Sequence, residues 1–110
     1  MGARTRTLTD MFVHSVYFWL RPDLTAQEEE TFVRLARALT EIDVVRHGFL
    51  GRPASTDRPV IERSYSYSLT LVFDDRAGHD VYQPHPTHEA FVDACGSYWS
   101  KVIIYDAEGI

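Results

Sequence analysis

The chain has 110 residues, of which 45% are hydrophobic, and this length and composition suit one globular domain with one core. Its formal net charge is −5 and its basic residues form no cluster, which argues against nucleic acid as a partner, because phosphate contacts need lysine or arginine. No apolar run approaches the roughly 20 residues that a membrane-spanning helix needs, so we expect no membrane partner either.

The two ends and the single cysteine carry further expectations. Residues 1–10 contain arginines but no apolar segment, so we predict a short flexible leader and not a secretory signal. We expect the folded domain to cover residues 11–107 and the tail, residues 108–110, to be frayed. Cys95 has no second cysteine to pair with and stands in an apolar helical pattern. A buried, unpaired thiol fits a reducing compartment, and we therefore expect a cytoplasmic protein.

The first predicted element is a strand over residues 12–20, which is rich in β-branched and aromatic residues and ends before Arg21-Pro22. Both of its faces carry large apolar groups, whereas a sheet with one face in water is polar on that face. We therefore expect both faces to be covered. Alternation gives one face to Phe12, His14, Val16, Phe18 and Leu20, and the other to Val13, Ser15, Tyr17 and Trp19.

A helix is predicted over residues 26–41, because Thr25 and Glu28 form a capping box and apolar residues follow at helical spacing. The later elements are separated by glycine, proline and aspartate, and two prolines predict a kink between the last two helices. In chain order we expect a strand at 44–50, a loop at 52–62, a strand at 64–73, a helix at 76–82, a helix at 89–98 and a strand at 101–105.

These elements follow the order β-α-β-β-α-β, which is the ferredoxin-like arrangement within the α+β class. Such a domain has a four-stranded antiparallel sheet with its helices on one face. In a chain this small the other face needs a cover, and the simplest cover is the same face of a second copy. We therefore predict that the chain is its own partner, in a homodimer whose sheets pack face to face.

The stretch from His79 to His88 is the densest in groups that titrate or donate protons near neutral pH, with three of the five histidines, one tyrosine and two prolines. Histidine titrates closest to physiological pH, and a tyrosine hydroxyl can donate a hydrogen bond from an apolar wall. The prolines restrict the residues before them, and we expect the kink to hold these side chains at an opening. His79, which precedes Asp80, is expected to face solvent.

Several segments together carry a likeness to a known family. They are Val13-His14-Ser15-Val16, Gly51, the run from Tyr82 to Phe91, and Val102-Ile103-Ile104-Tyr105-Asp106. These segments resemble the stress-responsive dimeric α+β barrel family, often called Dabb, and the likeness covers about residues 11–106. Its most specific part is the motif Tyr-x-x-His-Pro-x-His, from Tyr82 to His88. The resemblance implies a small cytoplasmic homodimer that forms a dimeric α+β barrel.

The resemblance also implies chemical roles. One plant member of the family closes a linear polyketide by aldol condensation without metal or cofactor, with the last histidine of the motif as base and its tyrosine assisting. By position these residues are His88 and Tyr82. Abstraction of a proton next to a carbonyl needs such a base and a donor for the enolate oxygen. We predict His88 and Tyr82 as catalytic candidates, and as ligand-binding candidates His14, His85, Phe18 and Tyr67.

Three functions remain open at this point. The first is binding of a small aromatic or carbonyl ligand in a pocket lined by Phe18, Tyr67 and Tyr82. The second is a cofactor-free cyclase, isomerase or lyase. The third is a structural, stress-protective assembly module, in which the histidines only satisfy the backbone around the kink and the tyrosine hydroxyl has a partner in the core.

A metal site is a weaker reading of the same stretch. His85 and His88, with His79 or Asp80 nearby, offer ligand atoms, but no second pair of histidines or cysteines accompanies them. No glycine-rich cofactor fingerprint and no haem-attachment motif occurs. We predict neither a metal nor a cofactor.

Overall fold

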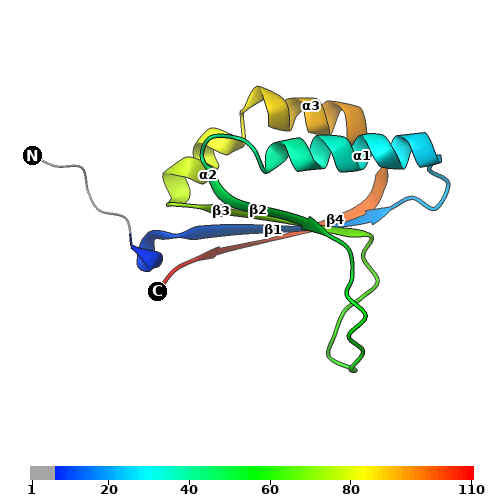
Figure 1. The fold of residues 1–110 in the computed structure, drawn as a ribbon, viewed down its shortest axis with the longest axis horizontal. Coiled ribbons are helices and arrows are strands. Elements are labelled where there is room, and N and C mark those ends of the chain that lie inside the picture. Colours follow the sequence, from blue (N-terminus) through cyan, green and yellow to red (C-terminus); the bar gives the residue numbers. More distant parts are fainter. Residues whose placement is uncertain (1–6) are drawn as a thin grey trace, which may run out of the picture.

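The computed structural model describes residues 7–110, which form four strands and three α-helices after one short 3-10 turn at Leu8–Asp10 (Figure 1). The predicted flexible leader lies mostly at residues 1–6, outside the described residues. In chain order the elements are β1 (Phe12–Leu20), α1 (Ala26–Leu39), β2 (Val45–Gly51), β3 (Tyr67–Phe73), α2 (Arg76–Tyr82), α3 (Pro86–Cys95) and β4 (Trp99–Glu108).

The strands form a single antiparallel sheet in the order β2-β3-β1-β4. All three helices lie on one face of this sheet, and none of them lies on the opposite face (Figure 1). The predicted ferredoxin-like order and the antiparallel sheet are therefore confirmed. None of the helices in residues 7–110 combines the length and the apolar character needed to cross a bilayer.

The alternation predicted for β1 is visible in its burial. Phe12, His14, Val16 and Phe18 are each at most 5% exposed, whereas the residues between them are only half-buried. The buried face packs against apolar residues of β3, with His14 opposite Leu71 and Val16 opposite Leu69. Because side chains alternate along a strand, this one register puts a histidine in the core beside the helices.

Sequence signals place the start of α1 correctly but not its end. Thr25 caps α1 by accepting a hydrogen bond from the backbone N–H of Glu28, as the capping box predicts. The helix ends at Leu39 rather than at residue 41, because Thr40 and the following residues form a tight turn into β2. β3 begins at Tyr67, three residues later than predicted.

The helix after the kink begins at Pro86, not at residue 89, and it ends at Cys95. Proline suits the first helical position, where its missing N–H costs nothing. His85 precedes it with an extended backbone, and the Nδ1 atom of His85 accepts a hydrogen bond from the backbone N–H of Thr87 at 3.1 Å. A histidine therefore caps this helix, a role usually filled by serine, threonine or aspartate.

β4 is longer at both ends than predicted, and this corrects the expected frayed tail. Glu108 pairs with Phe12 in the ladder, and the backbone N–H of Gly109 donates to the carbonyl of Met11 at 3.0 Å. The nine residues of β1 offer hydrogen bonds along their whole length, and β4 follows them. The longer pairing brings Asp106 into the ladder directly opposite His14.

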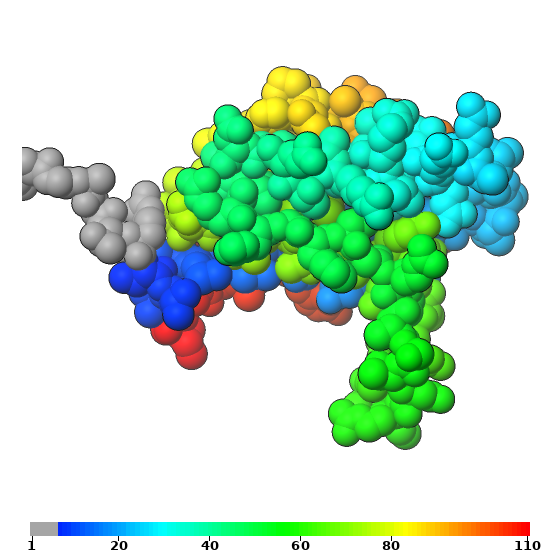
Figure 2. All heavy atoms as spheres, in the orientation of Figure 1, coloured from blue at the N-terminus to red at the C-terminus, as the bar shows by residue number. Residues whose placement is uncertain are grey.

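Between β2 and β3, residues 52–66 form an arm that extends away from the sheet on the side opposite the helices (Figure 1). Figure 2 shows the arm standing clear of the rest of the molecule. At its base, Ser64 accepts a hydrogen bond from the indole N–H of Trp19, and Tyr65 packs edge-on against Tyr17. The helix-free face thus carries aromatic side chains, including Tyr105, which is 62% exposed.

Candidate functional site

A cavity of about 200 Å³ lies between the sheet and helices α2 and α3. Most of its wall is apolar, and its few polar groups come from separate elements. His14 comes from β1, Tyr82 ends α2, Gln83 lies in the kink, and His88 lies in the first turn of α3. A mostly apolar hollow with a few converging polar groups is the usual form of a small-molecule site.

His88 is held by the kink itself. Its Nδ1 atom lies 2.9 Å from the backbone carbonyl oxygen of Gln83. A carbonyl only accepts hydrogen bonds, so Nδ1 carries the proton, and in the neutral ring Nε2 keeps its lone pair. Burial lowers the pKa of His88 below 6.5, and the opposing effects of the Gln83 carbonyl and Glu89 are smaller. The ring is therefore neutral and basic at Nε2 near neutral pH.

Tyr82 lies against this ring, with 4.8 Å between the two ring centroids. Its side chain is 1% exposed and also packs against His14 and Phe73. Among residues 7–110 the hydroxyl of Tyr82 has no hydrogen-bond partner, although Tyr82 lines the cavity. Burial strongly raises the pKa of Tyr82, so the hydroxyl stays protonated and remains a donor.

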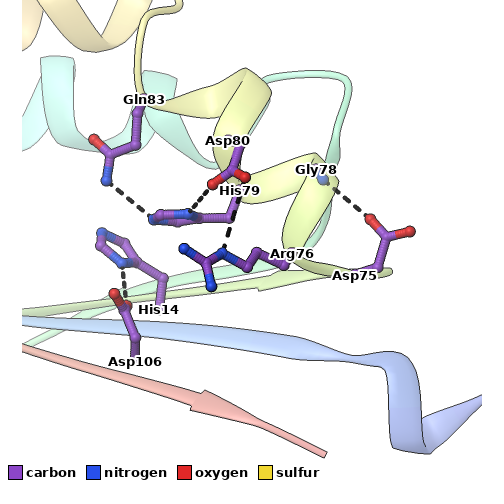
Figure 3. Close-up of polar contacts among 8 residues, drawn as sticks. All are labelled: His14, Asp75, Arg76, Gly78, His79, Asp80, Gln83 and Asp106. Atoms are coloured by element: carbon purple, nitrogen blue, oxygen red, sulfur yellow. Dashed lines mark hydrogen bonds and ion pairs between the residues drawn. The ribbon is translucent and has the colours of Figure 1, made fainter.

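His14 is paired with a residue that sequence analysis did not single out as part of the site. Its Nδ1 atom lies 2.6 Å from Oδ1 of Asp106, which faces it across the β1–β4 ladder (Figure 3). His14 is 3% exposed, and burial lowers its pKa despite the neighbouring carboxylate of Asp106. Asp106 stands near the end of the chain, and only the strand register reveals that it meets His14.

The six predicted site residues divide into two groups. His14, Phe18, Tyr82 and His88 line the cavity together. Tyr67 does not line it, because its ring packs on Phe32 and its hydroxyl donates to Glu29 at 2.7 Å. His85 caps α3 and lines a different hollow, between α3 and the end of α1. Tyr67 and His85 are thus outside the cavity that the other four share.

His79 was expected to face solvent, and that expectation is wrong. Its side chain is only 12% exposed, because its ring stacks on Phe12 at a centroid distance of 4.5 Å and lies 5.1 Å from the ring of His14. Helix α2 turns this residue toward the sheet, beside the His14–Asp106 pair (Figure 3). Helical spacing places His79 three residues before Tyr82, which is on the same face, and this was the signal that could have revealed it.

A larger cavity, of about 530 Å³, lies on the helix-free face of the sheet at the base of the arm. Aromatic residues such as Tyr17 and Trp19 line it, with Lys101 held 4.5 Å above the Trp19 ring. It contains no histidine, and the carboxylate in its wall, that of Glu62, is hydrogen-bonded to Ser64. We therefore assign the candidate site to the smaller cavity despite its size.

The sequence matches the family model described as Stress Responsive A/B Barrel Domain over residues 12–108. Among characterised proteins it is similar to olivetolic acid cyclase from Cannabis sativa, with 24% identity over 94 residues that cover 84% of this chain and 91% of the cyclase.

Solved structures agree with this fold. A dabb family protein with a ferredoxin-like fold from Mesorhizobium loti aligns with a TM-score of 0.72 and 29% identity, over 91% of this chain and 97% of that one. A dimeric ferredoxin-like protein of unknown function from Thermobifida fusca aligns with a TM-score of 0.73 and 16% identity, over 96% and 99%. Hydroxynitrile lyase from Passiflora edulis aligns with a TM-score of 0.75 and 12% identity, over 91% and 94%.

Proposed function

Because this chain belongs to the stress responsive A/B barrel domain family, we propose that it binds a small aromatic or carbonyl compound beside Tyr82 and His88 and acts on it as a cofactor-free enzyme of the cyclase or lyase type. One observation carries the proposal. His88 has its proton fixed on Nδ1 by the Gln83 carbonyl, and its ring lies beside the ring of Tyr82, whose hydroxyl has no hydrogen-bond partner within residues 7–110. A neutral base and an unused donor in one apolar cavity are the two groups that enolate chemistry needs.

The proposed reaction begins with proton transfer. Nε2 of His88 takes a proton from the carbon next to a carbonyl group, and the electrons of that C–H bond move into the enolate. The hydroxyl of Tyr82 donates a hydrogen bond to the enolate oxygen. The enolate carbon then forms a bond to a second carbonyl carbon, whose oxygen receives the proton from His88. A positioned base of this kind typically contributes about 10²–10⁴-fold to the rate.

His14 and Asp106 fit the same scheme as a positioning pair. The carboxylate of Asp106 accepts the Nδ1 proton of His14, which leaves Nε2 of His14 as an acceptor at the cavity wall. Such an acceptor orients a hydroxyl group of a substrate. The volume of about 200 Å³ lies below the range of about 300–1,000 Å³ that is usual for drug-sized ligands, which favours a small substrate.

Two observations favour this function over a purely structural module. A filled core would leave no cavity beside His88, and a structural tyrosine would have its hydroxyl paired. The relationship to olivetolic acid cyclase supports a carbonyl substrate. Dimeric relatives support self-association, and we propose that two copies pair through the helix-free faces of their sheets. A cytoplasmic location remains part of the proposal, in keeping with the buried free thiol of Cys95.

The first experiment measures binding. The thermal unfolding midpoint is followed with phenols, aromatic acids and short polyketide mimics for the wild type, Tyr82→Phe, His88→Gln and the control His47→Gln, whose side chain is exposed on β2. A ligand at about 100 times its Kd stabilises the native state by roughly 2.7 kcal/mol, which gives a clear shift. We expect an aromatic carbonyl compound to raise the midpoint of the wild type and of His47→Gln, and to raise it less in the other two variants.

The second experiment measures proton abstraction and does not require the product to be identified. In D₂O, NMR follows exchange of the carbon-bound hydrogen next to the carbonyl of a compound that binds. We expect the wild type to accelerate this exchange and His88→Gln to lose about 10²–10⁴-fold of the acceleration. Binding without exchange would reduce the function to ligand binding. No binding by any compound, together with a lower midpoint for His88→Gln alone, would favour the structural module instead.

A further inference from the structure

Three side chains of the kind that bind metal ions meet beside the cavity, and they come from three elements. They are His14 of β1, His79 of α2 and Asp106 of β4, and each offers one ligand atom within 4.8 Å of the others. Within residues 7–110 this is the one group of three or more histidine, cysteine or acidic side chains at such distances. It differs from the His85–His88 pairing that the sequence suggested.

The geometry is close to that of a bound ion. Zinc and similar ions hold nitrogen and oxygen ligands at about 2.0–2.2 Å, so two ligand atoms of a tetrahedral ion lie about 3.4 Å apart. His14 Nδ1 and Asp106 Oδ1 lie 2.6 Å apart as a hydrogen-bonded pair, so an ion that replaces the proton between them requires the two atoms to separate by about 0.8 Å. The ring of His79 lies above the ring of His14 (Figure 3), and an approach of about 1–1.5 Å by side-chain rotation completes the set.

The surroundings of His79 prepare it as a ligand. Nδ1 of His79 lies 3.2 Å from Oδ1 of Asp80, so the carboxylate accepts the Nδ1 proton and leaves the lone pair on Nε2. The amide nitrogen of Gln83 donates to this Nε2 atom at 3.0 Å (Figure 3), so the Gln83 side chain has to rotate away before the lone pair of Nε2 can bind an ion. A carboxylate behind the histidine is the usual arrangement in metal sites, because it fixes the ring and raises its basicity. Stacking on Phe12 holds the ring further.

Charge and access also suit a cation. A hollow of about 250 Å³ opens at His79 and Asp106, and Glu108 and Arg76 lie on its rim. The guanidinium of Arg76 lies 3.9 Å from the carboxylate of Asp80, and this carboxylate offsets the positive charge of Arg76. Three carboxylates, those of Asp80, Asp106 and Glu108, therefore surround the group against one arginine. The hollow leaves room for water or another small ligand on the open side of an ion.

We propose that His14, His79 and Asp106 bind one divalent first-row transition-metal ion, such as Zn²⁺. Two imidazoles and one carboxylate on one side of an ion, with the remaining positions open, suit zinc, iron(II), cobalt(II) or nickel(II). This site goes beyond the proposed function, which needs only His88 and Tyr82 for its proton transfer. The metal site and the cavity lined by Tyr82 and His88 share His14, so an ion bound here would also change the wall of that cavity.

The test uses the untagged full chain, stripped of metal by a chelator and then dialysed. Titration with Co²⁺ is followed by visible absorption, and Zn²⁺ is added afterwards as a competitor. We expect one ion per chain, with the cobalt bands lost on addition of Zn²⁺. His79→Phe, which keeps the flat ring on Phe12, should weaken binding by more than about 10-fold, and Asp80→Asn by about 10-fold. The control His47→Gln should bind as the wild type does.

Several results would overturn the proposal. They are the absence of stoichiometric binding in the wild type, equal affinity in His79→Phe, or loss of binding in His47→Gln. Circular dichroism checks that each variant is folded, and Asp106→Ala provides a second ligand deletion if His79→Phe is not. This test measures ion binding, whereas the test of His88 measures hydrogen exchange. A negative result in either experiment therefore does not change the outcome of the other.

Discussion

Nδ1 of His14 and Oδ1 of Asp106 lie 2.6 Å apart, although 92 positions separate the two residues in the chain. They face each other across antiparallel strands, on the side of the sheet that the helices cover. Asp106 is partly exposed at the edge of the sheet, whereas His14 is buried beneath α2. The contact thus joins the outer rim of the molecule to the wall of the candidate site.

The first prediction concerns the charge on His14. Asparagine at position 106 can still accept the Nδ1 proton but no longer favours the imidazolium. In Asp106→Asn we therefore expect the pKa of His14, already lowered by burial, to fall further. NMR titration of the ring protons of His14 measures this pKa. An unchanged or higher titration midpoint would contradict the conclusion that Asp106 favours the charged form of His14. We expect a stability loss of only about 1 kcal/mol, because the carboxylate is partly exposed.

The second prediction concerns the pH dependence of stability. Burial lowers the pKa of His88 in the folded state below 6.5, so the unfolded chain takes up the proton first as the pH falls. The contribution of neutral His88 to the free energy of unfolding is therefore fully present above about pH 6.5, and it is lost as the pH falls toward the pKa of His88 in the folded state. Urea midpoints of the wild type should decrease over this window, and those of His88→Gln should decrease less. An equal slope in both proteins would exclude His88 as a source.

The third prediction concerns the helix-free face. Tyr105 is 62% exposed on this face and packs edge-on against Tyr17. If two copies pair through these faces, Tyr105→Lys places two charges in an apolar interface and should raise the dimer dissociation constant by roughly 100-fold. Sedimentation velocity measures it. Val81→Lys, on the exposed side of the helix layer, is the control and should remain dimeric. A stable dimer of Tyr105→Lys would place the interface elsewhere.

The fourth prediction concerns two glycines with opposite expectations. A Cβ atom on Gly48 would collide with the side chain of Thr40 and come within 2.9 Å of its Cα atom. Gly48→Ala should therefore destabilise the protein by about 1–3 kcal/mol. Gly78 lies inside α2, and its Cβ would lie 3.4 Å from Phe73 at the nearest. Gly78→Ala should be neutral or stabilising by about 0.5–1 kcal/mol. Denaturant unfolding of both variants measures the contrast, and equal effects would contradict it.

The local features of the chain were predictable from their neighbours in sequence. The alternation in residues 12–20 placed His14 and Phe18 on the buried face, and the capping box at Thr25 located the start of α1. The motif from Tyr82 to His88 placed a tyrosine and a histidine on either side of a proline kink, and the two rings do meet. Each of these signals depends on residues only a few positions apart.

The remaining features depend on which segments pair, and no single segment carries that information. The length of β4 was missed because it follows the length of β1, its partner. The sequence did not reveal that His79 faces the sheet, because the orientation of α2 over the sheet is set by packing on Phe12 and Phe73. Tyr67 was predicted to line the pocket, but its ring packs on Phe32 and its hydroxyl donates to Glu29, and both of these residues belong to the neighbouring α1.

By itself, then, the sequence determined the order of the elements, the buried face of β1 and the residues around the kink, because hydrophobic period, capping and proline act over a turn or two of chain. Only the tertiary structure decided that Asp106 meets His14 and that His79 joins them, because strand register and helix orientation bring together side chains that are distant in sequence. It also decided that Tyr82 lines a cavity and that its hydroxyl has no hydrogen-bond partner within residues 7–110, since packing of the whole domain determines where space remains.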